Sequence, residues 1–295
     1  EDQRVVGVTP AMPSGCSMNI MQRELPTRVF DVGIAEGHAV TFSAGMAKAG
    51  LIPYCNIYSS FLQRAYDNII HDVALPKLHV VFCIDRAGIV GNDGATHHGL
   101  LDLAYLRPIP NMIIGAPMLS TDLQQMMRLA KDVNGPIAIR YPRGRSINRT
   151  GVPPVVLGQG VCIKHGSQVA VLSIGAIGNT VIDAINSMGI DKKNLFAHYD
   201  MRWLKPLDEL ILEEVAEHFH TIVTVEDGVI NGGLGSAVAE YMSGIGDRES
   251  GIGKRVIRLG VNDQFVEHGS TKELYQLLKL DKEGICKSLL QALEQ

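Results

Sequence analysis

The chain has 295 residues, of which 46% are apolar and 20% are charged, and its formal net charge is -4 at pH 7. This composition is typical of a globular protein, and the length favours two domains of about 150 residues each. No basic excess indicates a nucleic-acid partner, and no apolar run approaches the roughly 20 residues of a membrane-spanning helix. The five cysteines are far apart and form no CxxC pair, which favours the reducing cytoplasm.

Strand-like and helical segments alternate through the first half of the chain. Alternation of this kind is typical of a parallel sheet with crossover helices. The apolar runs predict strands at residues 28–34, 52–58, 79–85, 112–115 and 137–141. The segments with helical spacing of apolar residues predict helices at 37–49, 60–75 and 120–134.

A second series of the same kind follows a segment rich in Gly, Pro and Arg. That segment predicts a linker at residues 147–158, between domains at 1–146 and 159–295. The predicted strands of the second domain are 169–174, 195–199, 221–226 and 256–259, and its predicted helices are 179–188, 207–218, 234–242, 272–278 and 282–293. The sequence therefore predicts the α/β class, with two tandem three-layer domains and mostly parallel sheets.

Polar and aromatic side chains follow four of the predicted strands of the first domain. In parallel sheets, sites form outside the carboxyl ends of the strands. We therefore expect these side chains to converge on one pocket. They are Glu36 after the first strand, Tyr58 and Phe61 after the second, Arg86, Asp93 and His97 after the third, and Arg143 after the fifth.

Glu36 lies between two apolar runs, at the predicted start of a helix. One interpretation is a helix-start acid that the helix dipole favours by a fraction of a kcal/mol. The small residues that follow, Gly37, Ala39, Ala44 and Gly45, favour close packing and thus burial. A buried carboxylate is costly unless it is paired, and it can share a proton with a ring nitrogen of a ligand.

The stretch "DRAGIVGNDGATHHG" follows a buried strand and is too polar to be structural filler. Asp93, His97 and His98 could hold a metal, but one loop without further ligands makes this the weaker interpretation, and we expect no metal site. A His-Asp acid/base pair beside an arginine anion site fits better. Arg143, between Pro142 and Gly144, could grip a phosphate.

Together these residues resemble the thiamine-diphosphate enzymes of the transketolase superfamily. The similarity runs from "GVTPAM" through "FDVGIAEGHAVTFSAGMA" and "YPRG" to "DMRWLKPLD", "GGLGS" and "LGVNDQFVEHGS". Within the superfamily, "YSSFLQRAYD" and "DRAGIVGNDGATHHG" are most similar to the 1-deoxy-D-xylulose-5-phosphate synthase family. The resemblance thus implies a pyrimidine-binding domain followed by a transketolase C-terminal domain.

The resemblance also implies roles for the individual residues. Glu36 would bond the aminopyrimidine ring of thiamine diphosphate and act in catalysis, and Phe61 would stack on that ring, with Ile34 and Arg64 in its surroundings. Tyr58, Arg86 and Arg143 would hold the phosphate of glyceraldehyde 3-phosphate, and Asp93 and His97 would lie near the reacting carbons. The implied reaction joins pyruvate to this aldehyde, releases carbon dioxide and gives 1-deoxy-D-xylulose 5-phosphate, a precursor of isoprenoids, thiamine and pyridoxal. The family implies a homodimer.

Two departures from the family pattern stand out. Position 37 is Gly where the family commonly has Gln, which we expect to alter packing more than proton transfer. No G-D-G followed by N-x-N is present, the motif with which the family's first domain binds Mg²⁺ and the diphosphate. We therefore expect the chain to be inactive alone, with its thiamine diphosphate and Mg²⁺ sites completed by that domain.

Two alternative functions remain open. The chain could be a transketolase or the β-type subunit of a 2-oxo acid dehydrogenase, where a stand-alone chain of this length is natural. It could also be a non-catalytic interaction module. His97 with its loop and the "YPRG" turn favour the synthase over the other enzymes. An interaction module would have no use for a buried acid at Glu36.

Overall fold

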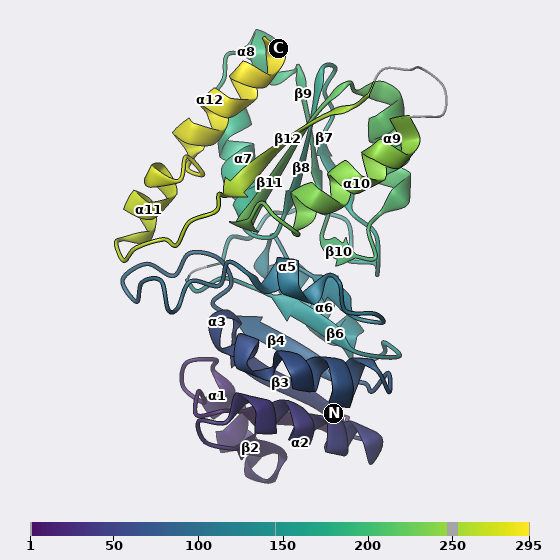
Figure 1. Cartoon of the computed structure of the whole chain (residues 1–295), viewed down its shortest axis with the longest axis vertical. Helices are drawn as coiled ribbons and strands as arrows, with labels where there is room; N and C mark the ends of the chain where they lie inside the picture. Colours follow the sequence, from purple (N-terminus) through teal and green to yellow (C-terminus); the bar gives the residue numbers. More distant parts are fainter. Residues whose placement is uncertain (1, 145, 247–252, 295) are drawn as a thin grey trace.

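The computed structural model describes residues 2–144, 146–246 and 253–294 and contains two α/β domains, each built around its own sheet. The amino-terminal domain lies at one end of the molecule in Figure 1 and the carboxy-terminal domain at the other. Most neighbouring strands pair in parallel. The predicted α/β class with mostly parallel sheets is therefore confirmed.

Among the described residues, the first sheet has seven strands. They are β1 (Val5–Thr9), β2 (Val29–Asp31), β3 (Ile52–Tyr58), β4 (Val81–Asp85), β5 (Ile113–Gly115), β6 (Ile137–Arg140) and β10 (Trp203–Lys205). Their spatial order is β10-β5-β6-β4-β3-β1-β2. The carboxyl ends of β3 and β4 lie side by side, because Tyr58 pairs with Asp85. The site-bearing segments that follow these two strands therefore start next to each other.

Helices cover both faces of this sheet. They are α1 (Met18–Glu24), the 3-10 turn η1 (Pro26–Arg28), α2 (Glu36–Lys48), α3 (Ser59–Leu62), the 3-10 turn η2 (Gln63–Ala65), α4 (Tyr66–Asn68), the π-helix η3 (Ile69–Ala74), α5 (Asp102–Leu106) and α6 (Ser120–Ala130). Successive residues of β4 belong to different hydrophobic core clusters. Phe82 packs in the cluster that contains residues of α2, and Cys83 packs in the cluster that contains residues of α6. This period of two places one helical layer on each face.

The segment predicted as one helix at residues 60–75 differs from that expectation. It is helical throughout, but it changes from α to 3-10, back to α, and then to a six-residue π-helix. Ala65 and Ile69 are completely buried against the core, whereas Arg64 points outward. Local departures of this kind re-aim side chains and are frequent at functional sites.

In the described part of the chain, the second sheet has five strands. They are β7 (Val161–Lys164), β8 (Val169–Ile174), β9 (Phe196–Asp200), β11 (Thr221–Val229) and β12 (Arg255–Val261), in the order β12-β11-β8-β9-β7. The helices of this domain are α7 (Ile177–Asn186), α8 (Ile190–Lys193), α9 (Glu209–His218), α10 (Leu234–Gly246), α11 (Thr271–Leu277) and α12 (Lys282–Leu293). In Figure 1, α7 and α12 cover one face of the sheet, and α9 and α10 cover the other. The central strands β8, β9 and β11 are buried almost throughout, as expected of a covered parallel sheet.

Strand β10 links the two domains, although it follows the second-domain strand β9 in sequence. It pairs antiparallel with β5 at the edge of the first sheet. Trp203 is completely buried there, and a side chain at Gly115 would clash with its ring. The sequence did not predict this strand, and it did not predict β1 or β7.

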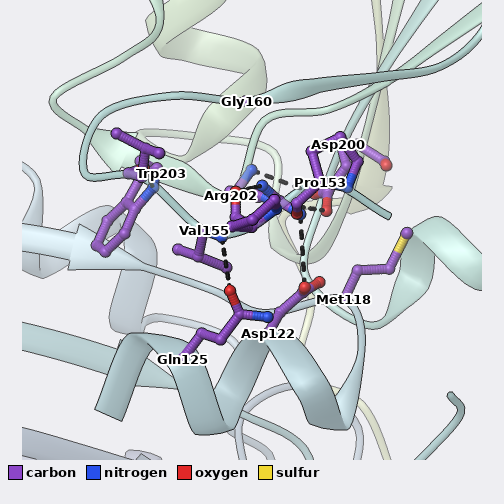
Figure 2. Close-up of polar contacts among 12 residues, drawn as sticks. Met118, Asp122, Gln125, Pro153, Val155, Gly160, Asp200, Arg202 and Trp203 are labelled. Carbon is purple, nitrogen blue, oxygen red and sulfur yellow. Dashed lines mark hydrogen bonds and ion pairs between the residues drawn. The ribbon is translucent and has the colours of Figure 1, made fainter. Parts of the chain in front are cut away.

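Figure 2 shows the polar contacts at the junction of the two domains. The buried Arg202 donates to the carbonyls of Pro153 and Pro154 at 2.8 and 3.1 Å. Its guanidinium also lies 3.5 Å from Asp122 Oδ1 of α6 and 3.9 Å from Asp200 Oδ2 of β9. One cation therefore joins residues from the predicted linker, the first domain and the second domain.

Candidate functional site

The Glu36 carboxylate is the first feature of the candidate site, and it is buried. Glu36 is the first residue of α2, directly after Ala35 at the N-cap. Its side chain is 6% exposed, and Oε1 accepts a hydrogen bond from Arg64 Nη1 at 3.0 Å. The predicted burial is therefore present, and the positive end of the helix dipole and Arg64 both stabilise the charge.

Gly37 packs closely against the irregular helical segment. A Cβ at this position would lie 2.9 Å from Asn68 Oδ1. Asn68 in turn donates to Thr41 Oγ1 at 3.0 Å and to Asp72 Oδ2 at 3.2 Å. The glycine therefore lets the first turn of α2 approach Asn68.

Aromatic rings and arginines form a continuous group beside Glu36. The Tyr58 and Phe61 rings stack with centroids 5.7 Å apart and an interplanar angle of 25°. Arg64 Cζ lies 5.0 Å from the Phe61 centroid, and Arg86 Cζ lies 3.7 Å from the Tyr58 centroid. Both distances lie within the range of cation–π attraction. Tyr58 at the end of β3 and Phe61 in α3 therefore form a chain of contacts. It runs from the Glu36–Arg64 pair to Arg86, directly after β4.

Arg86 is held in an uncommon backbone conformation at the end of β4. Its φ is +58°, in the left-handed region, and its amide donates to Asp85 Oδ1 at 2.7 Å. Its Nη1 donates to the carbonyl of Gly15 at 3.0 Å. Burial raises the pKa of the Asp85 carboxyl, while the neighbouring Arg86 charge counters this increase. A strained residue fixed by several contacts is typical of a functional site.

The loop that follows β4 brings His97 to this group. The His97 ring meets Phe61 edge-on with centroids 5.1 Å apart, and Nδ1 lies 2.9 Å from Thr96 Oγ1. Asp93 forms an ion pair with Arg143, with 3.0 Å between Oδ2 and Nη1. Both side chains of this pair are about half exposed to solvent. A ligand can therefore reach them from the solvent side.

A cavity of about 500 Å³ lies between the two domains and contains part of the predicted set. Arg86, Arg143 and Tyr141 line it from the first domain, and Asn179 of α7 lines it from the second. Asn179 is fixed by a hydrogen bond from Nδ2 to the carbonyl of Met118 at 2.9 Å. Two cationic side chains in one cleft favour an anionic ligand.

The predicted site residues therefore fall into three groups. Contacts connect Glu36, Arg64, Phe61, Tyr58, Arg86 and His97 in one series. Arg143 and Asp93 form a separate pair, and Arg143 shares the cavity lining with Arg86. Ile34 is 86% exposed, and no described contact connects it to the other predicted residues.

Sequence reasoning missed a second set of polar residues that supports this site. Arg140, at the end of β6, is buried and donates from Nε to Asp102 Oδ2 at 2.9 Å. Its Nη2 donates to the carbonyl of Asp227, in the second domain, at 2.9 Å. The available signal was an arginine that ends an apolar strand, because a buried charge needs a partner.

Neither a metal cluster nor a membrane-spanning helix is found in the described ranges. Among residues 2–144, 146–246 and 253–294, no group of three or more His, Cys, Asp or Glu side chains could hold a metal ion. Within the same ranges, every helix is too short or too polar to cross a bilayer.

Two family models match this chain. The model described as "Transketolase, pyrimidine binding domain" matches residues 1–146, and the model described as "Transketolase, C-terminal domain" matches residues 158–285. Together they cover most of the chain, including every residue predicted for the site.

Curated proteins with high identity cover nearly the whole chain. A protein of Parabacteroides distasonis named 1-deoxy-D-xylulose-5-phosphate synthase is 56% identical over 98% of this chain and 45% of its own length. One of Bacteroides fragilis with the same name is 55% identical over 97% of this chain and 44% of its own length. The chain thus spans less than half the length of these relatives.

Solved structures share the two-domain fold. A structure described as a split-gene transketolase, an inactive β4 tetramer, has a TM-score of 0.86 and 27% identity, and the match covers 99% of this chain and 93% of that one. A transketolase from Leishmania mexicana has a TM-score of 0.78 at 16% identity and covers 99% of this chain and 43% of its own. The second likeness concerns the fold alone.

Proposed function

Because the chain belongs to the transketolase family, whose pyrimidine-binding and C-terminal domains it carries, we propose that it serves a thiamine-diphosphate-dependent 1-deoxy-D-xylulose-5-phosphate synthase. The names of relatives at 55–56% identity support this proposal. The observation that carries it is the contact series from Glu36 through Arg64 and Phe61 to Tyr58 and Arg86. In that series a buried acid lies beside an aromatic platform and a cationic cleft.

The residues around Glu36 fit the aminopyrimidine end of thiamine diphosphate. Within the described part of the chain, Arg64 is the hydrogen-bond donor to the carboxylate, and it contacts Oε1, so Oε2 can accept from a ligand. Phe61 is partly exposed and offers its ring for stacking. When bound, the cofactor supplies the carbanion chemistry, and Glu36 holds a proton at the pyrimidine nitrogen.

The cavity between the domains fits a phosphate-bearing aldehyde. Arg86 and Arg143 line it, and guanidinium groups bind phosphate oxygens with two parallel hydrogen bonds. In this proposal Arg86, Arg143 and Tyr58 hold the phosphate of glyceraldehyde 3-phosphate. Asp93 and His97 orient the reacting end and exchange protons with it, and pyruvate is the second substrate.

The diphosphate end of the cofactor needs partners that these residues do not provide. We propose that Mg²⁺ and the diphosphate are bound by a further domain, and that the chain alone has no turnover. We also propose a homodimer in the cytoplasm. Light scattering of the purified protein measures the oligomeric state, and a monomeric mass would contradict the dimer.

A chimera tests the proposed activity. The part of the Parabacteroides distasonis protein that lies outside its match to this chain is fused to the chain. Product formation from pyruvate and glyceraldehyde 3-phosphate is then measured with thiamine diphosphate and Mg²⁺. The chimera should form 1-deoxy-D-xylulose 5-phosphate and carbon dioxide, and the chain alone should not. A folded chimera that binds the cofactor yet forms no product would contradict the synthase assignment. Product from the chain alone would contradict only its dependence on a further domain.

A second candidate function is that of a transketolase subunit. The observation that favours it is the likeness to the split-gene transketolase chain, most of whose length is covered. The same chimera distinguishes the two, because a transketolase transfers a ketol unit from a ketose phosphate without releasing carbon dioxide. Carbon dioxide release from labelled pyruvate supports the synthase, and ketol transfer without it supports the subunit.

A further inference from the structure

The loop that carries Asp93 and His97 belongs to the first domain, but one apolar side chain within it and one directly after it are buried in the second. Ile89 and Leu100 belong to a hydrophobic cluster composed mainly of second-domain residues, including Val225 and Val266. The Val229 amide also donates to the carbonyl of Leu100 at 2.9 Å. The loop therefore contributes to the core of the neighbouring domain and cannot change its path without exposing apolar surface.

His98 bonds the loop to the second domain through a defined tautomer. The amide of Val90 donates to His98 Nδ1 at 3.1 Å, so Nδ1 is the acceptor and the ring proton resides on Nε2. Nε2 lies 3.1 Å from the carbonyl of Glu267 and donates to it. His98 is 5% exposed, so these bonds are shielded from water. One ring thus closes the loop on itself and ties it to the segment after β12.

Asp227 forms the second attachment. Its Oδ2 accepts a hydrogen bond from the Tyr275 hydroxyl at 2.5 Å, and both residues belong to the second domain. Gly88 of the loop, with a φ of +79°, lies so close that a Cβ would be 1.9 Å from this oxygen. Burial raises the pKa of the Asp227 carboxyl, while Arg140 and the Ile89 amide counter the increase. The loop backbone at Gly88 therefore packs against the Asp227 carboxylate, whose position is held by the hydrogen bond from Tyr275.

The backbone on both sides of Asp93 also approaches the second domain closely. A Cβ at Gly91 would lie 3.2 Å from the carbonyl of Gly269, and a Cβ at Gly94 would lie 3.2 Å from His268 Cβ. Both glycines have positive φ, at 93° and 74°. The turn that presents Asp93 is therefore shaped by the surface at residues 268–271.

We infer that the second domain sets the conformation of the loop at residues 86–99, and that Asp227 and His98 are positioning residues for the Asp93 and His97 side chains. This inference gives the C-terminal domain a part in the site, although its own side chains contribute little to the group around Glu36. It rests on the proposed function only for the chemistry of Asp93 and His97. The order of the loop itself is independent of any activity.

Amide hydrogen exchange on the full chain tests the inference. Tyr275→Phe removes the hydroxyl that fixes Asp227, and Tyr199→Phe is its matched control, because Tyr199 donates to Glu214 at 2.8 Å in the same domain but away from the loop. We expect peptides covering residues 87–99 to exchange about tenfold faster in Tyr275→Phe and unchanged in Tyr199→Phe. Exchange in the strands of the second sheet should not change in either variant.

Two substitutions at His98 distinguish a specific effect on the loop from a general loss of stability of the chain. In His98→Asn the new side-chain oxygen can still accept from the Val90 amide, but the side chain is too short to reach Glu267. His98→Gln restores that reach, although the atom at its δ position is a carbon that cannot accept from the Val90 amide, so its rescue is partial. Loop exchange should therefore rise in His98→Asn and return toward the original rate in His98→Gln. Unchanged loop exchange in both Tyr275→Phe and His98→Asn would overturn the inference. Failure of the chimera to form product would leave this test unaffected.

Discussion

Arg64 connects the acid and the aromatic platform of the candidate site. Its Nη1 lies 3.0 Å from Glu36 Oε1, and its Cζ lies 5.0 Å from the centroid of the Phe61 ring. The Arg64 side chain is 61% exposed, whereas that of Glu36 is 6% exposed. Water therefore screens one end of a pair whose other end is buried, which limits its contribution to stability but not to ligand binding.

Replacing Arg64 should affect binding more than folding. For Arg64→Met we expect the free energy of unfolding to fall by less than about 1 kcal/mol, because the arginine is largely solvated. Thiamine diphosphate binding to the chimera, measured by calorimetry, should weaken about tenfold, because Glu36 and Phe61 lose their common neighbour. Arg4→Met, which removes the exposed pair with Asp2, is the control and should bind as before. Equal affinity in Arg64→Met and the unchanged chimera would contradict the expected role.

Replacing Glu36 should remove catalysis while the fold persists. In Glu36→Gln the amide keeps the shape of the side chain but cannot exchange a proton with a ring nitrogen. We expect the turnover number of the chimera to fall by roughly 10²–10⁴-fold, the range for loss of a general acid or base. The exposed Glu24→Gln is the matched control. Retained turnover in Glu36→Gln, with the fold intact by circular dichroism, would exclude the proposed role.

The buried ion pair between Arg140 and Asp102 should matter more to stability than the exposed one between Arg107 and Glu240. In Arg140→Met, Asp102 is left buried and unpaired, and we expect the free energy of unfolding in urea to fall by about 3–5 kcal/mol. In Arg107→Met, the free Glu240 is solvated, and the loss should stay below about 1 kcal/mol. Similar losses in both variants would contradict this interpretation of the two pairs.

Asp200 should make stability fall as pH rises toward neutral. Burial raises its pKa from 3.8 to about 7, although Arg202 counters the shift, and Asp122 shares the same cation. Between about pH 4 and pH 7 the folded chain therefore binds more protons at this residue than the unfolded chain does. Its contribution is largest below this range and is lost as pH increases through it, by at most about 1.4 kcal/mol per pH unit.

The matched variant for this effect is Asp200→Asn, which does not titrate. The difference in unfolding free energy between the original chain and the variant should decline with rising pH across this window and then become constant. Urea titrations at several pH values measure it. A difference that does not vary with pH would show that Asp200 titrates alike in the folded and unfolded chains.

The cysteines should differ in their reactivity. All five are free thiols, and Cys55 and Cys83 are buried in the first sheet. Burial raises the pKa of Cys55 to about 12 and that of Cys83 well above its usual value, so neither forms the reactive thiolate at neutral pH. Mass spectrometry after iodoacetamide treatment should find both unmodified in the folded chain, with partly exposed Cys286 modified. Rapid modification of Cys83 in native buffer would contradict its burial.

Strongly patterned elements could be predicted from the sequence because their own residues determine them. Strand β8 and helix α12 have the predicted bounds. A short continuous apolar run indicates a buried strand, and a long amphipathic repeat indicates a helix. The two short strands β1 and β10 were not predicted. Strand β1, Val5–Thr9, is as long as the predicted strand β9, so its length does not explain why it was missed. Trp203–Lys205 becomes a strand through its pairing with β5.

The candidate site shows the same division. Tyr58 and Phe61 are three residues apart at the start of a helix, so their proximity follows from local geometry. The pairing of Arg64 with Glu36 spans 28 residues, and the contact of Arg140 with Asp227 spans 87. Such contacts depend on how helices and domains pack, which no local pattern encodes. The anchoring of the loop by the second domain was for this reason not expected.

The antiparallel pairing of β10 with β5 determines where the chain can be truncated between its two domains. A truncation within residues 147–158 would leave β5 as an open edge, with unpaired backbone groups and an apolar hollow where Trp203 belongs. Exposed edges of this kind recruit strands from other molecules. Expressed without the residues after the linker, the first domain would form aggregates, so attempts to swap it between relatives should carry Trp203–Lys205 along.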